Sequence, residues 1–174
     1  DSFFPPGKVA DFWGFQYLRD NDPSEMGHNT DFLTRASIDT LAILTGAQRQ
    51  QLITLAKAQV ASIQDYGYKR FVLIKAFRRL LDGDLPSGTT GLSVDAVKAF
   101  SASLYQLDGQ ITLERAKVMG PMLASLTAAQ KASLDAMVGK GMTSWPASAE
   151  PAELTGLSRD VKENVMTYAG DLFS

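Results

Sequence analysis

Two long stripes of apolar residues constrain this chain more than any other feature of its sequence. Between Gly46 and Asp82 the apolar and aromatic residues recur mostly three or four positions apart, which places them on one face of a long helix. A second stripe follows the polar link "GDLPSGTTGLS". The first stripe contains Leu52, Ala56, Val60, Ile63, Tyr66, Ile74, Phe77 and Leu81, and the second contains Val97, Phe100, Leu104, Leu107, Ile111, Val118 and Met122. Two helices joined by a link of about ten residues predict an antiparallel hairpin over about 46–82 and 94–122.

The ends of these stripes carry residues that begin and end helices. Gly83 stands where a helix ends in the left-handed conformation, and Ser93 is a good N-cap for the second long helix. Gly120-Pro121 predicts a kink or break in that helix. Shorter helical patterns recur over 9–18, 30–43, 127–138 and 158–173. No segment alternates as a strand would, so we predict an all-α helical bundle in which shorter helices pack on the hairpin.

Length and composition fit one domain. A chain of 174 residues, 45% hydrophobic and 21% charged, can bury a substantial core, so residues 1–174 are expected to form a single α-helical domain. The apolar pattern of the last helix still recurs where the sequence stops at Ser174, which suggests that the natural chain continues. The chain begins at Asp1 without a methionine, as a periplasmic or secreted protein does after signal-peptide removal, although a trimmed chain would look the same.

The charge balance and the lack of cysteine exclude several classes of function. The 17 Lys and Arg residues nearly balance 19 Asp and Glu residues, so no global field attracts nucleic acid or an acidic membrane surface. Without cysteine there are no disulfides, thiolate metal sites, iron–sulfur clusters or cysteine nucleophiles. No apolar run approaches the ~20 residues of a membrane span. We therefore expect a protein partner, no nucleic acid and no transmembrane segment.

A short motif occurs twice. The segment "LTGAQRQQL" (residues 44–52) is echoed by "LTAAQKASL" (residues 126–134). In each copy a threonine precedes a glutamine by three residues, which is the spacing of a capping box. The threonine hydroxyl then accepts from the N3 amide, and the glutamine reaches back to the N-cap amide. Two helix starts, at Thr45 and Thr127, would explain the echo.

The paired LTxxQ motifs also resemble those of the Spy and CpxP periplasmic chaperones, which are small, cysteine-poor, exported α-helical proteins. This resemblance implies a helical-hairpin cradle that holds unfolded clients or a sensor kinase domain. Only the two motifs carry the similarity. The segments "ADFWGFQYL" and "MTSWP" and the last helix depart from that family, and the whole chain is more similar to uncharacterised exported bacterial proteins.

His28 is the only histidine in the chain, and Met26 lies two residues before it in a segment rich in turn-forming residues. An imidazole and a thioether at this spacing suit copper, and either side chain can ligate a haem iron. The other interpretation is that His28 helps to cap the helix that begins near Thr30. The neighbouring run "DNDPSE" fits turn formation as well as calcium binding. A haem or copper carrier that uses His28 and Met26 is therefore an alternative function.

The segment "LDGQITLER" (residues 107–115) imitates the second half of an EF-hand, but Leu, Gln and Arg occupy positions that need charged ligands. We predict a helix here, with one polar residue, Asp108, and a close helix contact at Gly109. The sequence has no phosphate loop, nucleophile elbow or Glu-x-x-His pair, so we expect no enzyme. Acid–base work by Asp108 and Glu114 would require burial.

Basic residues gather in the second half of the first long helix: Lys69, Arg70, Lys75, Arg78 and Arg79. Solvated surface near a negative helix end is one interpretation. The other is a binding surface for an acidic partner, because arginine presents a fork matched to carboxylates. Asp65, Asp108 or Glu114 could pair with this segment across the hairpin. We predict a non-catalytic exported binding protein, chaperone-like or a subunit of an envelope or extracellular assembly, with these five residues as its partner surface.

Overall fold

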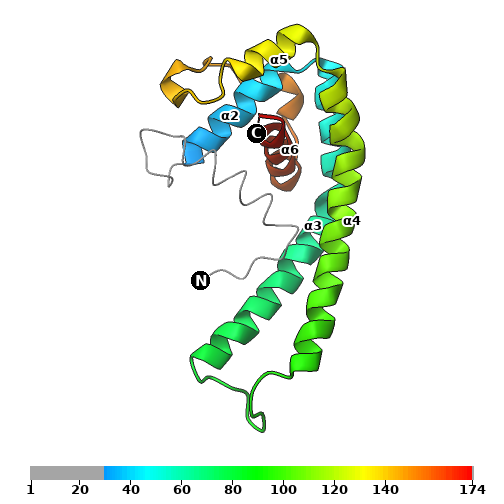
Figure 1. Ribbon diagram of the computed structural model, residues 1–174, viewed down its shortest axis with the longest axis vertical. Helices are drawn as coiled ribbons and strands as arrows, with labels where there is room; N and C mark the ends of the chain where they lie inside the picture. Colours follow the sequence, from blue (N-terminus) through cyan, green and yellow to red (C-terminus); the bar gives the residue numbers. More distant parts are fainter. Residues whose placement is uncertain (1–29, 174) are drawn as a thin grey trace.

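In the computed structural model, residues 30–173 are described, and within them the secondary structure is entirely helical. Helices α3 (Gly46–Leu81) and α4 (Val94–Ser125) form a long antiparallel hairpin (Figure 1). Three shorter helices gather where α3 begins and α4 ends: α2 (Thr30–Ile43), α5 (Ala128–Asp135) and α6 (Arg159–Phe173). The predicted all-α bundle built on a hairpin is confirmed.

The hairpin begins and ends at the predicted cap residues. Asp82 is the C-cap of α3, and the following Gly83 has a φ of 70°, which glycine adopts without a steric penalty. The Ser93 hydroxyl accepts from the backbone amide of Ala96 at 3.3 Å and caps α4. The Ser158 hydroxyl likewise accepts an amide at the start of α6. These boundaries follow from local chemistry that the sequence displays.

Of the kink or break predicted at Gly120-Pro121, the break is wrong. α4 passes through Pro121 and ends at Ser125. Gly120 and Pro121 are exposed, whereas Met119 and Met122 beside them are buried in the core. Burial of the two methionines offsets the hydrogen bond that proline is unable to donate, so the last turn of α4 is kept.

The two halves of the hairpin have different surroundings. The proximal half (46–64 of α3 and 108–125 of α4) packs against the shorter helices, with α6 lying against both α2 and α3. Its core includes Leu41, Leu52, Ala56, Met122, Leu134, Val165, Tyr168 and Leu172. In the distal half (65–81 and 94–107), α3 and α4 are the only labelled helices in Figure 1. The smaller core there contains Tyr66, Leu73 and Leu104, with Ile111 at its inner end.

The loop that follows α5 is anchored by Trp145. Its indole N–H donates to the carbonyls of Met137, at 2.9 Å, and Lys140, at 3.0 Å. Its ring meets Phe173 edge to face, with the ring centroids 5.3 Å apart. Two short 3₁₀ turns, Met142–Ser144 and Ala152–Leu154, lie within the same loop. The tryptophan thereby ties a long loop to the end of α6.

Two further predictions differ in outcome. α5 ends at Asp135 rather than at the predicted Val138, and a turn with a positive φ at Gly139 follows. The helix predicted over 9–18 lies outside the described residues. Within residues 30–173, no helix has both the length and the apolar character that crossing a membrane requires.

Candidate partner-binding surface

The two LTxxQ motifs form the N-terminal caps of α3 and α5. At α3 the Thr45 hydroxyl accepts from the Gln48 amide at 3.2 Å, and Gln48 Oε1 accepts from the Thr45 amide at 2.8 Å. At α5, Thr127 and Gln130 form the same two bonds, at 3.2 and 3.0 Å. The capping-box interpretation is therefore confirmed at both motifs.

The same two glutamines also bind each other, which the motif spacing did not predict. Gln130 Nε2 donates to Gln48 Oε1 at 2.8 Å and to the carbonyl of Ile43, at the end of α2, at 3.0 Å. Both glutamines are only 8% exposed. The leucines that precede the two threonines, Leu44 and Leu126, are buried in one core, which brings the two motifs together. We call Gln48 and Gln130 the glutamine joint.

The glutamine joint holds helix ends together by hydrogen bonds. It connects the end of α2 with the starts of α3 and α5, three helix ends that would otherwise leave buried polar groups unpaired. Its two side chains are amides, which do not titrate near neutral pH. The joint therefore contributes hydrogen bonds that hold the three helix ends together.

Polar contacts also fasten α6 to the proximal half. The fully buried Gln59 donates to Glu114 Oε2 at 3.1 Å and accepts from the Tyr168 hydroxyl at 2.6 Å. Arg115 pairs with Asp171, and its guanidinium lies 4.9 Å from the centroid of the Tyr168 ring. Residues of α3, α4 and α6 thus share one polar network, so the proximal face of α3 is committed to internal packing.

The two carboxylates considered for acid–base work lie in different surroundings, because Asp108 is buried and Glu114 is half-buried. Hydrogen bonds from Gln59 and then Gln110 hold the pKa of Glu114 below its ordinary value, so this group stays ionised at neutral pH. Asp108 is 4% exposed and lies inside α4, not in a cation-binding loop. The expected close contact at Gly109 is wrong, because a Cβ there would meet nothing within 4 Å on the exposed side of α4.

Two of the five predicted surface cations are engaged within their own segment. Lys69 pairs with Asp65, one turn earlier in α3, at 2.6 Å. Arg79 pairs with Asp84 of the link at 3.0 Å. The pairing of Asp65 is therefore local rather than across the hairpin. Lys69 and Arg79 contribute to the local structure at the two ends of the basic segment.

The other three cations occupy two faces of α3. Arg70 is half-buried and lies one turn before the buried Leu73, on the face that meets α4. Lys75 and Arg78 are exposed, and no ion pair joins them to a carboxylate in the part of the chain that the structure describes. Of the five predicted cations, Lys75 and Arg78 are therefore the two that are exposed and have no ion pair with a carboxylate among residues 30–173.

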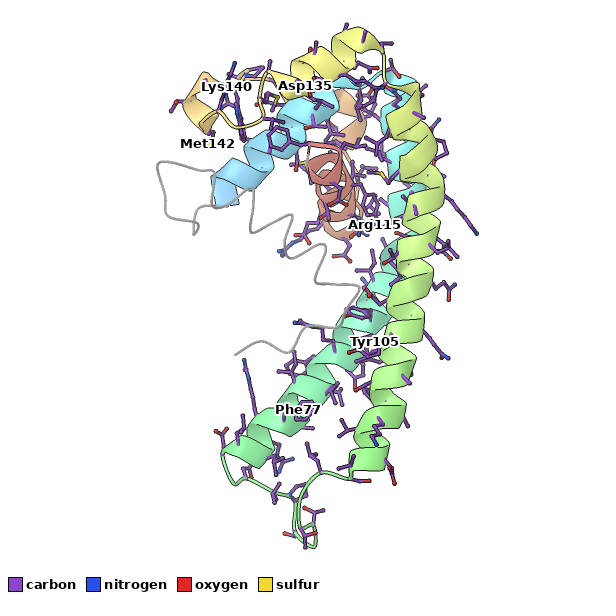
Figure 2. All side chains as sticks on the ribbon, in the orientation of Figure 1. Phe77, Tyr105, Arg115, Asp135, Lys140 and Met142 are labelled. Carbon is purple, nitrogen blue, oxygen red and sulfur yellow. The ribbon has the colours of Figure 1, made fainter. Side chains whose placement is uncertain are left out.

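Two exposed aromatic side chains share the face that carries Lys75 and Arg78. Tyr68 is 70% exposed and Phe71 is 60% exposed. The four residues follow one another by three, four and three positions, so they form one continuous row along α3. We call Tyr68, Phe71, Lys75 and Arg78 the distal stripe. In Figure 2, Phe77 marks the distal part of α3, and Tyr105 marks α4 nearer the middle of the hairpin.

The aromatic pair of the distal stripe was absent from the sequence prediction. Apolar residues occur on several faces of α3 after Tyr66, and their spacing alone does not say which of them α4 covers. The structure separates them, because Leu73 is 5% exposed whereas Phe71 is 60% exposed. The sequence prediction therefore lacked the exposed fraction of each apolar side chain, which only the packing of α4 against α3 determines.

The predicted metal ligands lie elsewhere. His28 and Met26 are outside the described residues, as is the acidic run near them, so the haem or copper site stays a prediction. Among residues 30–173 no group of three or more His, Cys, Asp or Glu side chains is placed to hold a metal ion.

Comparisons of the chain with protein-family models, with curated proteins and with solved structures found no significant match. The resemblance of the LTxxQ motifs to those of Spy and CpxP therefore remains a prediction.

Proposed function

We propose that this chain is a non-catalytic binding protein that acts outside the cytoplasm and holds a protein partner on the distal half of its hairpin. The observation that carries the proposal is the distal stripe, where exposed aromatic rings adjoin exposed cations. Tyrosine, phenylalanine and arginine are enriched at protein interfaces, while large exposed apolar groups are costly to leave in water. The external location is supported by the motif resemblance and is compatible with the lack of cysteine.

Two versions of this function make different use of the hairpin. A chaperone-like cradle would hold many unfolded clients weakly, as the LTxxQ resemblance implies. A subunit of an envelope or extracellular assembly would hold one fixed partner. Both versions require the distal stripe to be accessible, and neither requires a catalytic group.

Suppression of aggregation tests the chaperone version. The full chain is mixed at near-equimolar ratio with an unrelated protein that aggregates on heating, and light scattering is followed. We expect suppression by the wild type and its loss in a Tyr68→Ser, Phe71→Ser double variant. Leu113→Ser, which removes an exposed apolar side chain from α4, is the matched control and should act as the wild type does.

Co-purification tests the subunit version. The tagged chain, produced in its natural cell, should recover the same partners in a fixed ratio, and the Tyr68→Ser, Phe71→Ser variant should lose them. A wild-type chain that neither suppresses aggregation nor recovers a fixed partner would contradict the proposal. Cell fractionation that places the natural protein in the cytoplasm would contradict the proposed location.

A further inference from the structure

We infer that the partner presents an amphipathic helix with Asp or Glu residues beside its apolar face, and that this acidic helix lies along the distal stripe. The inference rests on the proposed function and adds the chemistry of the partner. It follows from how the face of α3 is already covered in the proximal half and from what changes where that cover ends.

α6 shows how a helix covers this face. At the middle of α3, Gln64 Nε2 donates to Asp160 Oδ2 of α6 at 2.7 Å. α6 also inserts apolar side chains, including Val161 and Val165, into the core beside α3. In the proximal half, α3 is therefore packed against a helix with an apolar face and a carboxylate beside it.

The distal stripe continues the row that Gln64 begins. Tyr68 lies four positions after Gln64 and Phe71 lies seven positions after it, so all three are neighbours on one face of α3. No described helix covers the face beyond this point (Figure 1). The face of α3 that contacts α6 at Gln64 thus continues to Tyr68 and Phe71, which are exposed.

The character of the face changes from apolar to cationic along its length. After Tyr68 and Phe71 come Lys75 and Arg78, and residues 66–81 contain five basic residues and no acidic residue. Lys75 and Arg78 lack a carboxylate partner among residues 30–173. A partner that matches this order is apolar opposite the rings and anionic opposite the cations, which favours carboxylates that arginine binds in a bidentate manner.

The geometry of the row favours a helix rather than an extended segment. From Tyr68 to Arg78 the stripe spans about 15 Å along the axis, or about three helical turns. When two helices pack together, the side chains in contact are spaced three and four residues apart along each helix. A partner helix of about three turns would therefore contact the whole stripe.

Peptide binding to the full chain tests this inference. The probes are fluorescent 15-residue helical peptides with Leu at positions 1, 4, 8 and 11 and either Glu or Lys beside them, and the readout is fluorescence anisotropy. We expect the Glu peptide to bind more tightly than the Lys peptide, with an affinity that falls as salt is added. Lys75→Gln with Arg78→Gln should weaken the Glu peptide about tenfold.

A matched variant distinguishes binding by the distal stripe from a general attraction of the peptide to positive charge. Arg79→Gln removes one charge from the same turn as Arg78, but this arginine is paired with Asp84. It should change the affinity for the Glu peptide by less than about twofold. Phe71→Ser should weaken the same peptide without lowering the melting temperature, because the ring is largely exposed.

Several outcomes would overturn the inference. These are equal binding of the two peptides, binding of anionic lipid vesicles in place of the Glu peptide, or a self-association that Lys75→Gln with Arg78→Gln abolishes. A large loss of stability in Phe71→Ser would also overturn it, because the chain itself would then cover the stripe. If the wild-type protein passes the aggregation or co-purification test while the two peptides bind equally, only the inference of an acidic partner helix is overturned. If the wild-type protein fails both tests, the proposed binding function is overturned as well.

Discussion

The same helix behaves differently in the two halves of the hairpin. In the proximal half α3 is covered on two sides, by α4 and by α6, and a polar network around Gln59 joins all three helices. In the distal half α3 meets α4 alone among the described helices and leaves Tyr68 and Phe71 exposed. The difference indicates that the proximal half stabilises the molecule, while the distal half presents a surface.

Core truncation should separate the two halves by the largest margin. Leu52 is 0% exposed and lies among residues of several helices, whereas Leu73 is 5% exposed in the smaller distal core. Leu52→Ala should lower the free energy of unfolding by about 4 kcal/mol, and Leu73→Ala by about 2 kcal/mol, because the distal helices can close around a cavity more easily. Urea unfolding measures both values.

The comparison would be wrong if Leu73→Ala cost as much as Leu52→Ala. Val94→Ala is the control, because Val94 is an exposed apolar side chain at the distal end of α4 and its truncation should have little effect. Equal costs at Leu52 and Leu73 would mean that the distal half is packed as firmly as the proximal half.

Helix caps should show the next largest difference. Gln130→Ala removes a capping bond together with the donors to Gln48 and Ile43 and should lower the free energy of unfolding by about 2 kcal/mol. Ser93→Ala removes a single cap at the distal end of α4 and should cost about 1 kcal/mol. Chemical denaturation of both variants gives the comparison.

A double-mutant cycle distinguishes a joint from two independent caps. If Gln48 and Gln130 stabilise each other, the cost of changing both to alanine will be less than the sum of the two single costs. Strictly additive costs would mean that the LTxxQ motifs act only as separate capping boxes.

Most of the fold was predictable because its signals are local. The stripes of α3 and α4, the cap residues Thr45 and Ser93 and the stop at Gly83 all act within one or two helical turns. Gly120-Pro121 predicted a kink or break, and the helix continues through Pro121 because the neighbouring methionines are buried. Local pattern thus predicted where helices form better than where they end.

The candidate surface was predictable only in part, because it depends on long-range packing. The sequence indicated that Lys75 and Arg78 are surface residues, but it did not separate them from Lys69, whose partner is Asp65. The exposure of Phe71 depends on where α4 and α6 lie, and no periodicity reports that. The contact between the two LTxxQ glutamines was hidden for the same reason.

Acid should weaken the proximal half through Glu114. Bonds from Gln59, and secondly from Gln110, lower the pKa of Glu114 in the folded state. Such a carboxylate stabilises the fold above its ordinary pKa of about 4.5, and this contribution is lost as the pH falls through the lowered value. Unfolding at a series of pH values should therefore show that wild type is more stable than Glu114→Gln at pH 7.

The difference between wild type and Glu114→Gln should shrink as the pH falls below 4.5. Gln110→Ala removes the second donor and should raise the carboxyl pKa of Glu114 part of the way, which an NMR titration measures directly. A difference between wild type and Glu114→Gln that is the same at pH 3 and pH 7 would contradict a stabilising role for the ionised carboxylate.

The smallest effect on stability is expected at the distal stripe, and this contrast connects stability with function. Arg115 of the proximal half pairs with Asp171 and lies against Tyr168, so Arg115→Gln should lower the melting temperature measurably. Lys75→Gln with Arg78→Gln should change the free energy of unfolding by no more than about 0.5 kcal/mol, since only the favourable position of Arg78 near the end of α3 is lost. Thermal unfolding followed by circular dichroism measures both. If the distal pair proved as costly as Arg115, these cations would belong to the internal structure of the hairpin, and the distal half would not be a surface kept for a partner.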